Sequence, residues 1–221
     1  MHSPTEENYL KAIYRLGKMD ENAKITPTTI AEAVRVNPAS VIDMIKKLTE
    51  KQLIDYDKVN GAKLTDSGRR FALNIVRKHR LWEVFLFEKL GYSWDAVHDI
   101  AEQLEHIQNA ELADRLEQFL GFPEYDPHGD PIPNAMGELP NMVNTLLCDV
   151  ELGKTCRVAA VKDTSTVFLQ YLQHLNISIG STIKVRDKVI YDGSLSVEIA
   201  DAAASMVSKK LAESLLVRVL D

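Results

Sequence analysis

Imidazole and carboxylate side chains recur at the spacing of a helical turn in the middle of this chain of 221 residues. His79 and Glu83 lie four residues apart, and a second group follows within one predicted helix. Residues three or four apart share a helix face. Such a stripe beside an apolar face is costly unless its charges are paired or bind a metal ion, so the pattern predicts a metal site. The second group comprises His98, Glu102, Glu105 and His106.

The types of donor atom narrow the choice of metal. Four of the six histidines fall between residues 79 and 128, interleaved with carboxylates, and no cysteine lies among them. Nitrogen and oxygen donors without thiolate suit Mn²⁺, Fe²⁺, Co²⁺ or Zn²⁺. The sequence contains neither an EF-hand loop nor an HExxH motif. The alternative is that these side chains occupy exposed helix faces and bind no metal.

The net charge of −6 is unevenly distributed. Residues 1–72 have 12 basic and 10 acidic side chains, residues 73–145 have 5 and 13, and residues 146–221 have 9 and 9. A mildly basic head therefore precedes a strongly acidic middle that could hold cations. No apolar run is long enough to cross a bilayer, and the polar start lacks the apolar core of a signal peptide, so we expect a cytoplasmic protein with no membrane partner. Cys148 and Cys156 are eight residues apart and indicate neither a disulfide framework nor a zinc ribbon.

The head contains three consecutive helix starts. Each joins an N-cap residue to a proline at the first helical position, in Ser3-Pro4, Thr26-Pro27 and Asn37-Pro38. Apolar residues at helical spacing follow each start. The short turn at residues 35–37 between the second and third helices predicts a helix-turn-helix, whose second helix can enter the major groove of DNA.

Two short strand-like runs flank Asn60-Gly61, a typical hairpin turn, and complete the element order of a winged helix. Lysines on the third helix and the hairpin could reach phosphates. Near the start of that helix, Asn could read adenine and Ala could touch a thymine methyl, while Asp43 is unfavourable near phosphate but could accept from cytosine. The alternatives are that the lysines form a solvated face and that Asn37 only caps its helix. The candidate DNA contacts are Thr29, Asn37, Ala39, Ser40, Asp43, Lys46, Lys47, Lys58 and Lys63, with Lys51 beside them.

The acidic middle begins with a long helix capped by Thr65 and predicted to end at about Leu90, before Gly91. Ser93 is the predicted cap of the next helix, which carries the second ligand group. Five of the eight prolines lie in the stretch that follows Gly121. That stretch cannot form a regular helix, and it indicates a linker that could also wrap a site.

The tail changes to short alternating runs, as at residues 182–185 and 195–199 on either side of Asp192-Gly193. We therefore expect a mainly α protein with small β elements, in three domains. These are a winged helix over residues 1–72, a helical metal-binding and dimerisation domain with its proline-rich linker over 73–145, and a small β domain over 150–221.

The chain resembles the metal-dependent repressors of the diphtheria toxin repressor (DtxR) and manganese transport regulator (MntR) family. The resemblance covers nearly the full length. It implies an SH3-like β-barrel of the FeoA type for the tail. The segments that carry it are TEENYLKAIYRL, the winged helix through GAKLTDSGRR, RKHRLWEVFLFEKLG, VHDIAEQLEHI and DPHGDPIP.

The resemblance also implies ligands for two metal sites. The primary regulatory site falls on Asn8, Glu102, Glu105 and His106. The second falls on His79, Glu83 and His98. In some manganese-sensing relatives the second site also draws on positions that match Asp126, His128 and Asp163, although Asp126 stands where those relatives carry Cys.

Three positions bear on the metal that this family resemblance implies. The iron branch of the family has Cys at the position of Glu102, whereas the manganese branch has Glu, and a carboxylate favours Mn²⁺. The first-helix ligand is Met in the iron branch and Asp in the manganese branch, but Asn8 here. Lys11 stands where one manganese subgroup has a ligating Glu, so a two-metal cluster of that kind is not expected.

These features predict a homodimeric, Mn²⁺-activated repressor of metal-uptake genes that binds a palindromic operator in double-stranded DNA. An Fe²⁺-responsive repressor of the same family is the alternative. Two further readings are a non-haem metal enzyme, against which the absence of paired Glu-x-x-His segments argues, and a regulator whose metal is only structural. Apolar residues on the middle helices could form the dimer contact or simply the core, namely Trp82, Phe85, Leu86 and Phe119.

Overall fold

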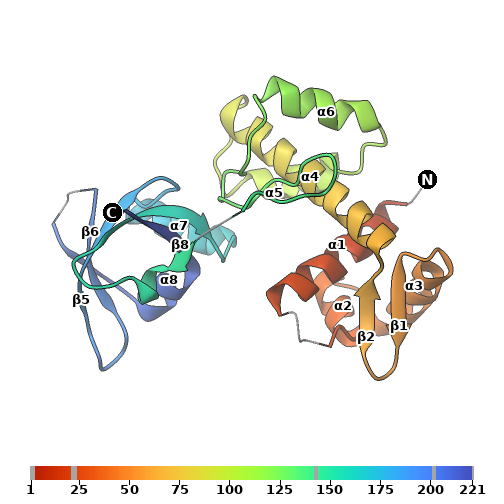
Figure 1. Ribbon diagram of the computed structural model, residues 1–221, viewed down its shortest axis with the longest axis horizontal. Helices are drawn as coiled ribbons and strands as arrows, with labels where there is room; N and C mark the ends of the chain where they lie inside the picture. The colour runs from red at the N-terminus through yellow and green to blue at the C-terminus, as the bar shows by residue number, and fades with distance from the viewer. Residues whose placement is uncertain (1–2, 21–23, 142–143, 201–202, 221) are drawn as a thin grey trace. The chain divides into compact units, whose positions relative to one another are not determined.

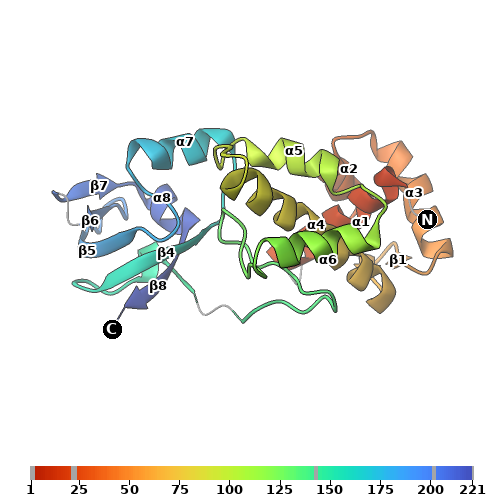
Figure 2. The same ribbon diagram turned by 90° about the horizontal axis from the view of Figure 1, so that it is seen from above.

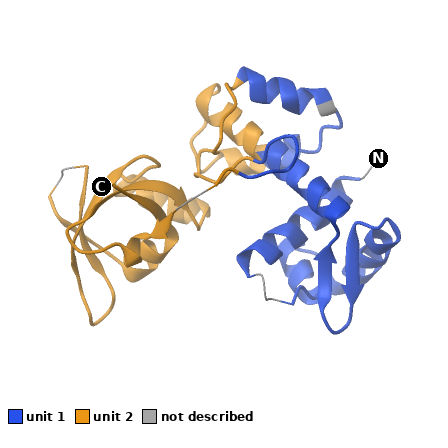
Figure 3. Ribbon diagram, viewed as in Figure 1, with its two compact units in different colours: residues 1–79, 102–119, 133–139 blue, residues 80–101, 120–132, 140–221 orange. Residues whose placement is uncertain are grey.

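The computed structural model of the chain describes residues 3–20, 24–141, 144–200 and 203–220 (Figure 1). The chain divides into two compact units, coloured separately in Figure 3. The first contains residues 1–79, 102–119 and 133–139, and the second contains residues 80–101, 120–132 and 140–221. Within the described ranges, no helix combines the length and the apolar character needed to span a membrane.

The first unit opens with the expected winged helix. Ser3 and Glu6 form a capping box, in which the Ser3 side chain accepts from the Glu6 backbone N–H and the Glu6 carboxylate accepts from the Ser3 N–H. The Asn37 side chain accepts from the Ala39 N–H at 2.9 Å, so Asn37 does cap its helix. The elements are α1 (Pro4–Met19), α2 (Pro27–Val34), α3 (Pro38–Glu50), β1 (Ile54–Asp57) and β2 (Gly61–Leu64).

The hairpin is held against the helices by its own backbone. The Ala62 N–H donates to the Ile25 carbonyl at 2.8 Å. A Cβ on Gly61 would lie 2.5 Å from that same carbonyl oxygen, and Gly61 has a φ of +79°, so only glycine fits this close approach. The core beneath includes the fully buried side chains Leu10, Ile13, Ile30, Leu48 and Ile54.

Helix α4 (Asp66–Glu88) follows the hairpin directly. The Thr65 hydroxyl accepts from the Gly68 N–H at 3.0 Å, which confirms the predicted cap. The helix ends as expected before Gly91, whose φ of +71° turns the chain so that the Tyr92 N–H donates to the Leu86 carbonyl.

Two predictions about the next helices were wrong. Helix α5 (Val97–Leu104) begins four residues after Ser93 and ends before Glu105, so Glu105 and His106 lie on a turn rather than on the helix. The Leu104 carbonyl accepts from the Ile107 N–H at 3.2 Å, the tightened bond with which helices often end. Helix α6 (Ala110–Phe119) follows, and it was not predicted from the sequence.

The tail is an antiparallel sheet of six strands in the order β3-β8-β4-β5-β6-β7. The predicted hairpin is present, with Val185 opposite Val197 across β5 and β6. Helices α7 and α8, which the sequence did not predict, accompany this sheet (Figure 2). Their buried leucines belong to the same hydrophobic core as the strands. The remaining elements are β3 (Thr145–Leu146), a 3₁₀ turn (Leu147–Asp149), β4 (Thr155–Val161), α7 (Thr166–His174), β5 (Thr182–Lys188), β6 (Leu195–Ile199), β7 (Ser205–Val207), α8 (Lys209–Ser214) and β8 (Leu215–Leu220).

Candidate metal centres and nucleic-acid interface

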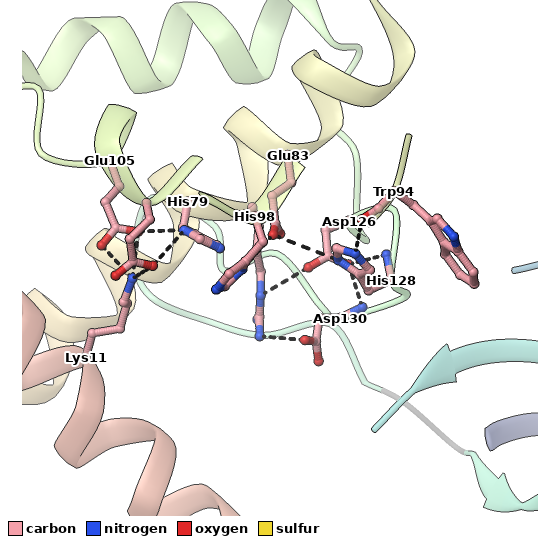
Figure 4. Close-up of polar contacts among 11 residues, drawn as sticks. Lys11, His79, Glu83, Trp94, His98, Glu105, Asp126, His128 and Asp130 are labelled. Carbon is pink, nitrogen blue, oxygen red and sulfur yellow. Dashed lines mark hydrogen bonds and ion pairs between the residues drawn. The ribbon is translucent and has the colours of Figure 1, made fainter. Parts of the chain in front are cut away.

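A lysine ammonium lies among the carboxylates predicted for the primary site. Lys11 Nζ of α1 lies 2.7 Å from Glu102 Oε2 and 2.6 and 2.8 Å from the two oxygens of Glu105 (Figure 4). His79 Nδ1 lies 2.6 Å from Glu105 Oε2. Lys11 and Glu105 are both buried, so the ammonium is the charge partner of these carboxylates away from water.

The other predicted ligands of this set have different surroundings. His106 Nδ1 lies 2.6 Å from a buried carboxylate oxygen of Glu7, whose second oxygen accepts from the Gln108 side chain at 2.8 Å. Asn8 Oδ1 is buried and has no hydrogen-bond partner among the described residues.

The primary set therefore does not fit a metal ion as the side chains stand. Three oxygens that would coordinate the ion already receive hydrogen bonds from Lys11. A second cation beside that ammonium would face like-charge repulsion in a water-poor setting, where charges interact strongly.

The second predicted set is divided between the two compact units. Glu83 and His98 both belong to the second unit, and His98 Nδ1 lies 3.2 Å from Glu83 Oε1. His79 belongs to the first unit and lies one turn before Glu83 on the continuous helix α4, so the two share a helix face.

A buried cluster within the second unit unites Glu83 with two of the loop residues. Glu83, Asp126 and His128 each offer a ligand atom, and these atoms all lie within 4.8 Å of one another. All three side chains are buried. Figure 4 shows them converging from α4 and from the loop between α6 and β3.

The ring of His128 is oriented with one nitrogen facing the carboxylates. Nε2 lies 2.7 Å from the Trp94 carbonyl, which can only accept, so Nε2 carries the hydrogen. In the neutral imidazole Nδ1 is then the nitrogen with the lone pair, and it lies 3.9 Å from Glu83 Oε1. This second hydrogen bond is the arrangement that commonly fixes a metal-binding histidine.

The loop that carries Asp126 and His128 is fixed by its backbone. The Asp126 N–H donates to the Asp130 carbonyl, and Asp126 Oδ1 accepts from the N–H groups of His128 and Asp130 at 2.8 and 3.0 Å. The Val161 N–H of β4 donates to the His128 carbonyl at 3.0 Å. Gly129 has a φ of +82°, and a Cβ there would lie 1.9 Å from the Ala159 carbonyl oxygen. The loop thus abuts β4 so closely that only glycine fits.

The electrostatics of this cluster favour a cation. Burial first, and then the carboxylates of Glu83 and Asp130, raise the pKa of Asp126 well above its usual range. Arg80 offsets part of this, with Nε 3.5 Å from Asp126 Oδ2 and a further nitrogen 3.4 Å from Asp130 Oδ2, and it also donates to the Pro131 carbonyl. Arg80 thus pairs with Asp126 and Asp130, while Glu83 lies beside the imidazoles of His98 and His128. A divalent ion would offset the like charges of the buried carboxylates.

Asp163 is the predicted ligand that the geometry does not bring into this cluster. Its Oδ1 accepts from the Ser165 N–H at 2.9 Å, just before α7. The three-residue group around Glu83 does not include it.

The predicted DNA-contacting side chains occupy the exposed face of α3 and the hairpin. Lys47 and Lys51 also pair with the buried Glu6, at 2.9 and 2.7 Å. Burial alone would raise the pKa of Glu6, but hydrogen bonds from these two lysines outweigh it and lower the pKa to about 2. Thr29 is half-buried, and its hydroxyl completes the capping box of α2 by accepting from the Thr26 N–H at 2.9 Å. The exposed candidates are Asn37, Ala39, Ser40, Asp43, Lys46, Lys47, Lys58 and Lys63.

Sequence reasoning missed several residues with a part in these sites. Ile42 is 60% exposed on α3 beside a groove of about 380 Å³ that Lys46 and Lys58 also line. The sequence could have indicated Ile42, because it lies four residues before Lys46 and the two therefore share one face of the helix. The ion pairs of Glu7 and Arg80 had no such signal, because their partners are distant in sequence.

Three family models match consecutive parts of the chain. The iron dependent repressor N-terminal DNA binding domain matches residues 1–62, the iron dependent repressor metal binding and dimerisation domain matches residues 65–134, and the FeoA domain matches residues 145–219. Among curated relatives, the transcriptional regulator MntR of Oceanobacillus iheyensis is 34% identical over 122 residues, 55% of this chain and 81% of its own length. The iron-dependent repressor IdeR of Mycobacterium tuberculosis is 28% identical over 197 residues, 88% of this chain and 84% of its own length.

Solved structures of metal-dependent regulators are similar to this chain over nearly its whole length. A manganese-dependent transcriptional repressor in complex with manganese is 38% identical, with a TM-score of 0.87, and covers 97% of this chain and 100% of its own. The manganese regulator SloR is 32% identical with a TM-score of 0.75, covering 98% and 99%. The chain therefore belongs to the iron-dependent repressor family of DtxR, IdeR and MntR, whose members are metal-dependent DNA-binding repressors rather than enzymes.

Proposed function

We propose that this chain is a homodimeric repressor whose affinity for operator DNA rises when Mn²⁺ binds at Glu83, Asp126 and His128. The observation that carries the proposal is the buried cluster itself, with two carboxylates and an imidazole lone pair converging within 4.8 Å. His98, which contacts Glu83, is a further ligand candidate, and Asp163 would have to leave its present hydrogen bond to become one.

The donor set and the relatives both support Mn²⁺ as the first metal to test. Carboxylate and imidazole donors suit Mn²⁺, and no thiolate is present to favour softer ions. A manganese-dependent transcriptional repressor and the manganese regulator SloR are 38% and 32% identical to this chain, and the iron-dependent repressor IdeR is 28% identical. Fe²⁺ is therefore the alternative effector. Either ion, when bound, would supply two positive charges beside the neighbouring carboxylates of Glu83 and Asp126.

Coupling to DNA requires that the metal favour one arrangement of the chain over others. Helix α4 begins directly after the hairpin, where the Thr65 N–H donates to the Leu53 carbonyl at 3.1 Å, and it carries Glu83 further along. A metal that fixes Glu83 to the loop residues therefore constrains a helix joined directly to the DNA-binding hairpin.

The proposed mode of DNA binding follows from the winged helix. In a twofold-symmetric dimer, the two α3 helices would enter successive major grooves about 34–36 Å apart and read a palindromic operator. Lys46, Lys58 and Lys63 would contact phosphates, while Asn37, Ala39 and Ser40 would face base edges. The family resemblance makes genes of metal uptake the expected targets.

The test is a selection followed by a titration. A randomised DNA duplex library is selected with the Mn²⁺-loaded protein, and the affinity for the recovered sequence is then measured by fluorescence anisotropy with Mn²⁺, Fe²⁺, Zn²⁺ or EDTA. We expect a twofold-symmetric recovered sequence and an affinity about 5–150-fold higher with Mn²⁺ than with EDTA, the usual range of allosteric coupling. Equal affinity with every metal and with EDTA, from a folded protein, would show that the metal is only structural.

A further inference from the structure

We propose that the Lys11 ammonium is a built-in cation in the site formed by Asn8, His79, Glu102, Glu105 and His106. In this chain the ammonium, rather than a metal ion, would hold α1 to the segment at residues 102–106. The regulatory metal would then bind only at Glu83, Asp126 and His128. The location of the regulatory metal rests on the proposed function, whereas the role of the Lys11 ammonium does not.

The contacts of Lys11 resemble those of a coordinated ion. Its Nζ has three hydrogens and lies 2.6–2.8 Å from three oxygens that belong to Glu102 and Glu105. Charged N–H···O bonds of this length are the strong ones. Glu105 is 0% exposed, and its carboxylate also lies 2.6 Å from His79 Nδ1 and 3.8 Å from His106 Nε2. Without the ammonium, this buried carboxylate would face only imidazoles among the described residues.

A second pair makes the same connection without a metal. Glu7, one turn before Lys11 on α1, is bonded through one oxygen to His106 and through the other to Gln108. Glu7 and Lys11 thus tie one face of α1 to the 102–108 segment with opposite charges. His106, a predicted metal ligand, already has a carboxylate partner in this arrangement.

A divalent ion and the ammonium exclude each other at this site. Lys11 contacts both oxygens of Glu105, so an ion held by Glu105 needs an oxygen that the ammonium already contacts. If it were displaced, Lys11 would be a buried charge that has lost these partners. Asn8, one turn before Lys11 on the same face of α1, offers a buried oxygen that has no hydrogen-bond partner among the described residues. It becomes a usable ligand only when the ammonium is removed.

The inference predicts one metal ion per chain in the wild type and a second when Lys11 is neutralised. Equilibrium dialysis against Mn²⁺, with manganese measured by mass spectrometry, counts the ions per chain. We expect one equivalent for the wild type, for Lys11→Arg, which keeps the charge, and for Lys18→Met, an exposed control on the same helix. Lys11→Met should bind two, and the second should be lost in the double variant Lys11→Met with Glu105→Gln.

Glu105→Gln in the wild-type background keeps the inference falsifiable even if Lys11→Met does not fold. Manganese binding should stay at one equivalent in Glu105→Gln and fall to none in Asp126→Asn. Two equivalents in the wild type, with one lost in Glu105→Gln, would show that a metal displaces the ammonium and would overturn the inference. If the wild type binds no manganese and Lys11→Met binds one equivalent, the proposed function is overturned. The role of Lys11 as a built-in cation would still stand, because removing the ammonium would have opened a metal site.

Discussion

Asp126 lies among carboxylates in a buried position, and its pKa is raised well above the usual range by burial first and then by Glu83 and Asp130. An ionised carboxylate here is costly without a cation. We therefore expect this cluster to lower the stability of the chain when no cation is bound.

Replacing Asp126 by Asn tests this cost. The amide keeps an oxygen for the N–H groups of His128 and Asp130 but removes the like charge beside Glu83. We expect the metal-free melting temperature to be unchanged or to rise by about 2–4 °C, which corresponds to about 1 kcal/mol for a chain of this size. The increase in melting temperature on adding Mn²⁺ should be lost. A drop in the metal-free value would mean that Asp126 is structural.

The reactivity of the Cys156 thiol reports how tightly the tail is packed around it. Cys156 is fully buried, and burial raises the pKa of its thiol to about 11 from an ordinary value of 9.0. Raising the pH through that interval should destabilise the native state, because the unfolded chain releases this proton first. With Ellman's reagent at pH 8, we expect at most the Cys148 thiol to react in the native chain and both thiols to react in guanidinium. Immediate reaction of both in the native chain would contradict the packing.

Residue types alone predicted the polar clusters but not the partners within them. The spacing of His79 and Glu83 was visible in the sequence, as was the unusual Lys11. The bonds from Lys11 to Glu102 and Glu105 were not, because they join residues more than 90 positions apart. Long-range pairing depends on how helices pack, which helical periodicity does not reveal.

At the scale of elements, the loop of Asp126 and His128 depends on a single glycine. Gly129→Ala would place a Cβ 1.9 Å from the Ala159 carbonyl oxygen, so the loop must move although no ligand is changed. We expect Mn²⁺ affinity, measured by calorimetry, to fall at least tenfold. Gly121→Ala is the matched control, since Gly121 has a similar φ of +78° and open space around it. Equal affinities for both variants would mean that the loop position does not set the site.

On α3, we expect some side chains to set the affinity for DNA and others to set the sequence specificity. Lys46→Ala should weaken binding to all DNA sequences alike and reduce the salt slope of log affinity by about 1, because one phosphate contact is lost. Ser40→Ala should instead change which bases are preferred. Lys210→Ala, an exposed change on α8, should do neither. An unchanged salt slope for Lys46→Ala would remove that residue from the DNA interface.

Elements marked by local signals were predicted well. The capped helices of the head, the Asn60-Gly61 hairpin and the Gly91 stop are fixed by nearby residues, and the structure contains all of them. The early end of α5 and the helices α6, α7 and α8 were missed. Glu105 and His106, the two residues after α5, bond to α1, and no local pattern encodes those bonds.

At the scale of the whole molecule, the compact units do not follow the three family segments. The matched metal-binding and dimerisation segment, residues 65–134, contributes to both units. Of the apolar residues considered for a dimer contact, Leu86 is buried within its own chain, whereas Phe119 is 66% exposed and remains a candidate. Helix α4 is continuous through both units, and it carries Glu83 of the proposed metal site as well as the link to the hairpin.

The most direct test of this account is the ratio of operator affinities with Mn²⁺ and with EDTA, measured for the wild type and for Asp126→Asn. We predict a ratio of about 5–150 for the wild type and a ratio near 1 for the variant, with the two proteins equal in EDTA. An undiminished ratio in Asp126→Asn would contradict the claim that metal at Glu83, Asp126 and His128 controls DNA binding.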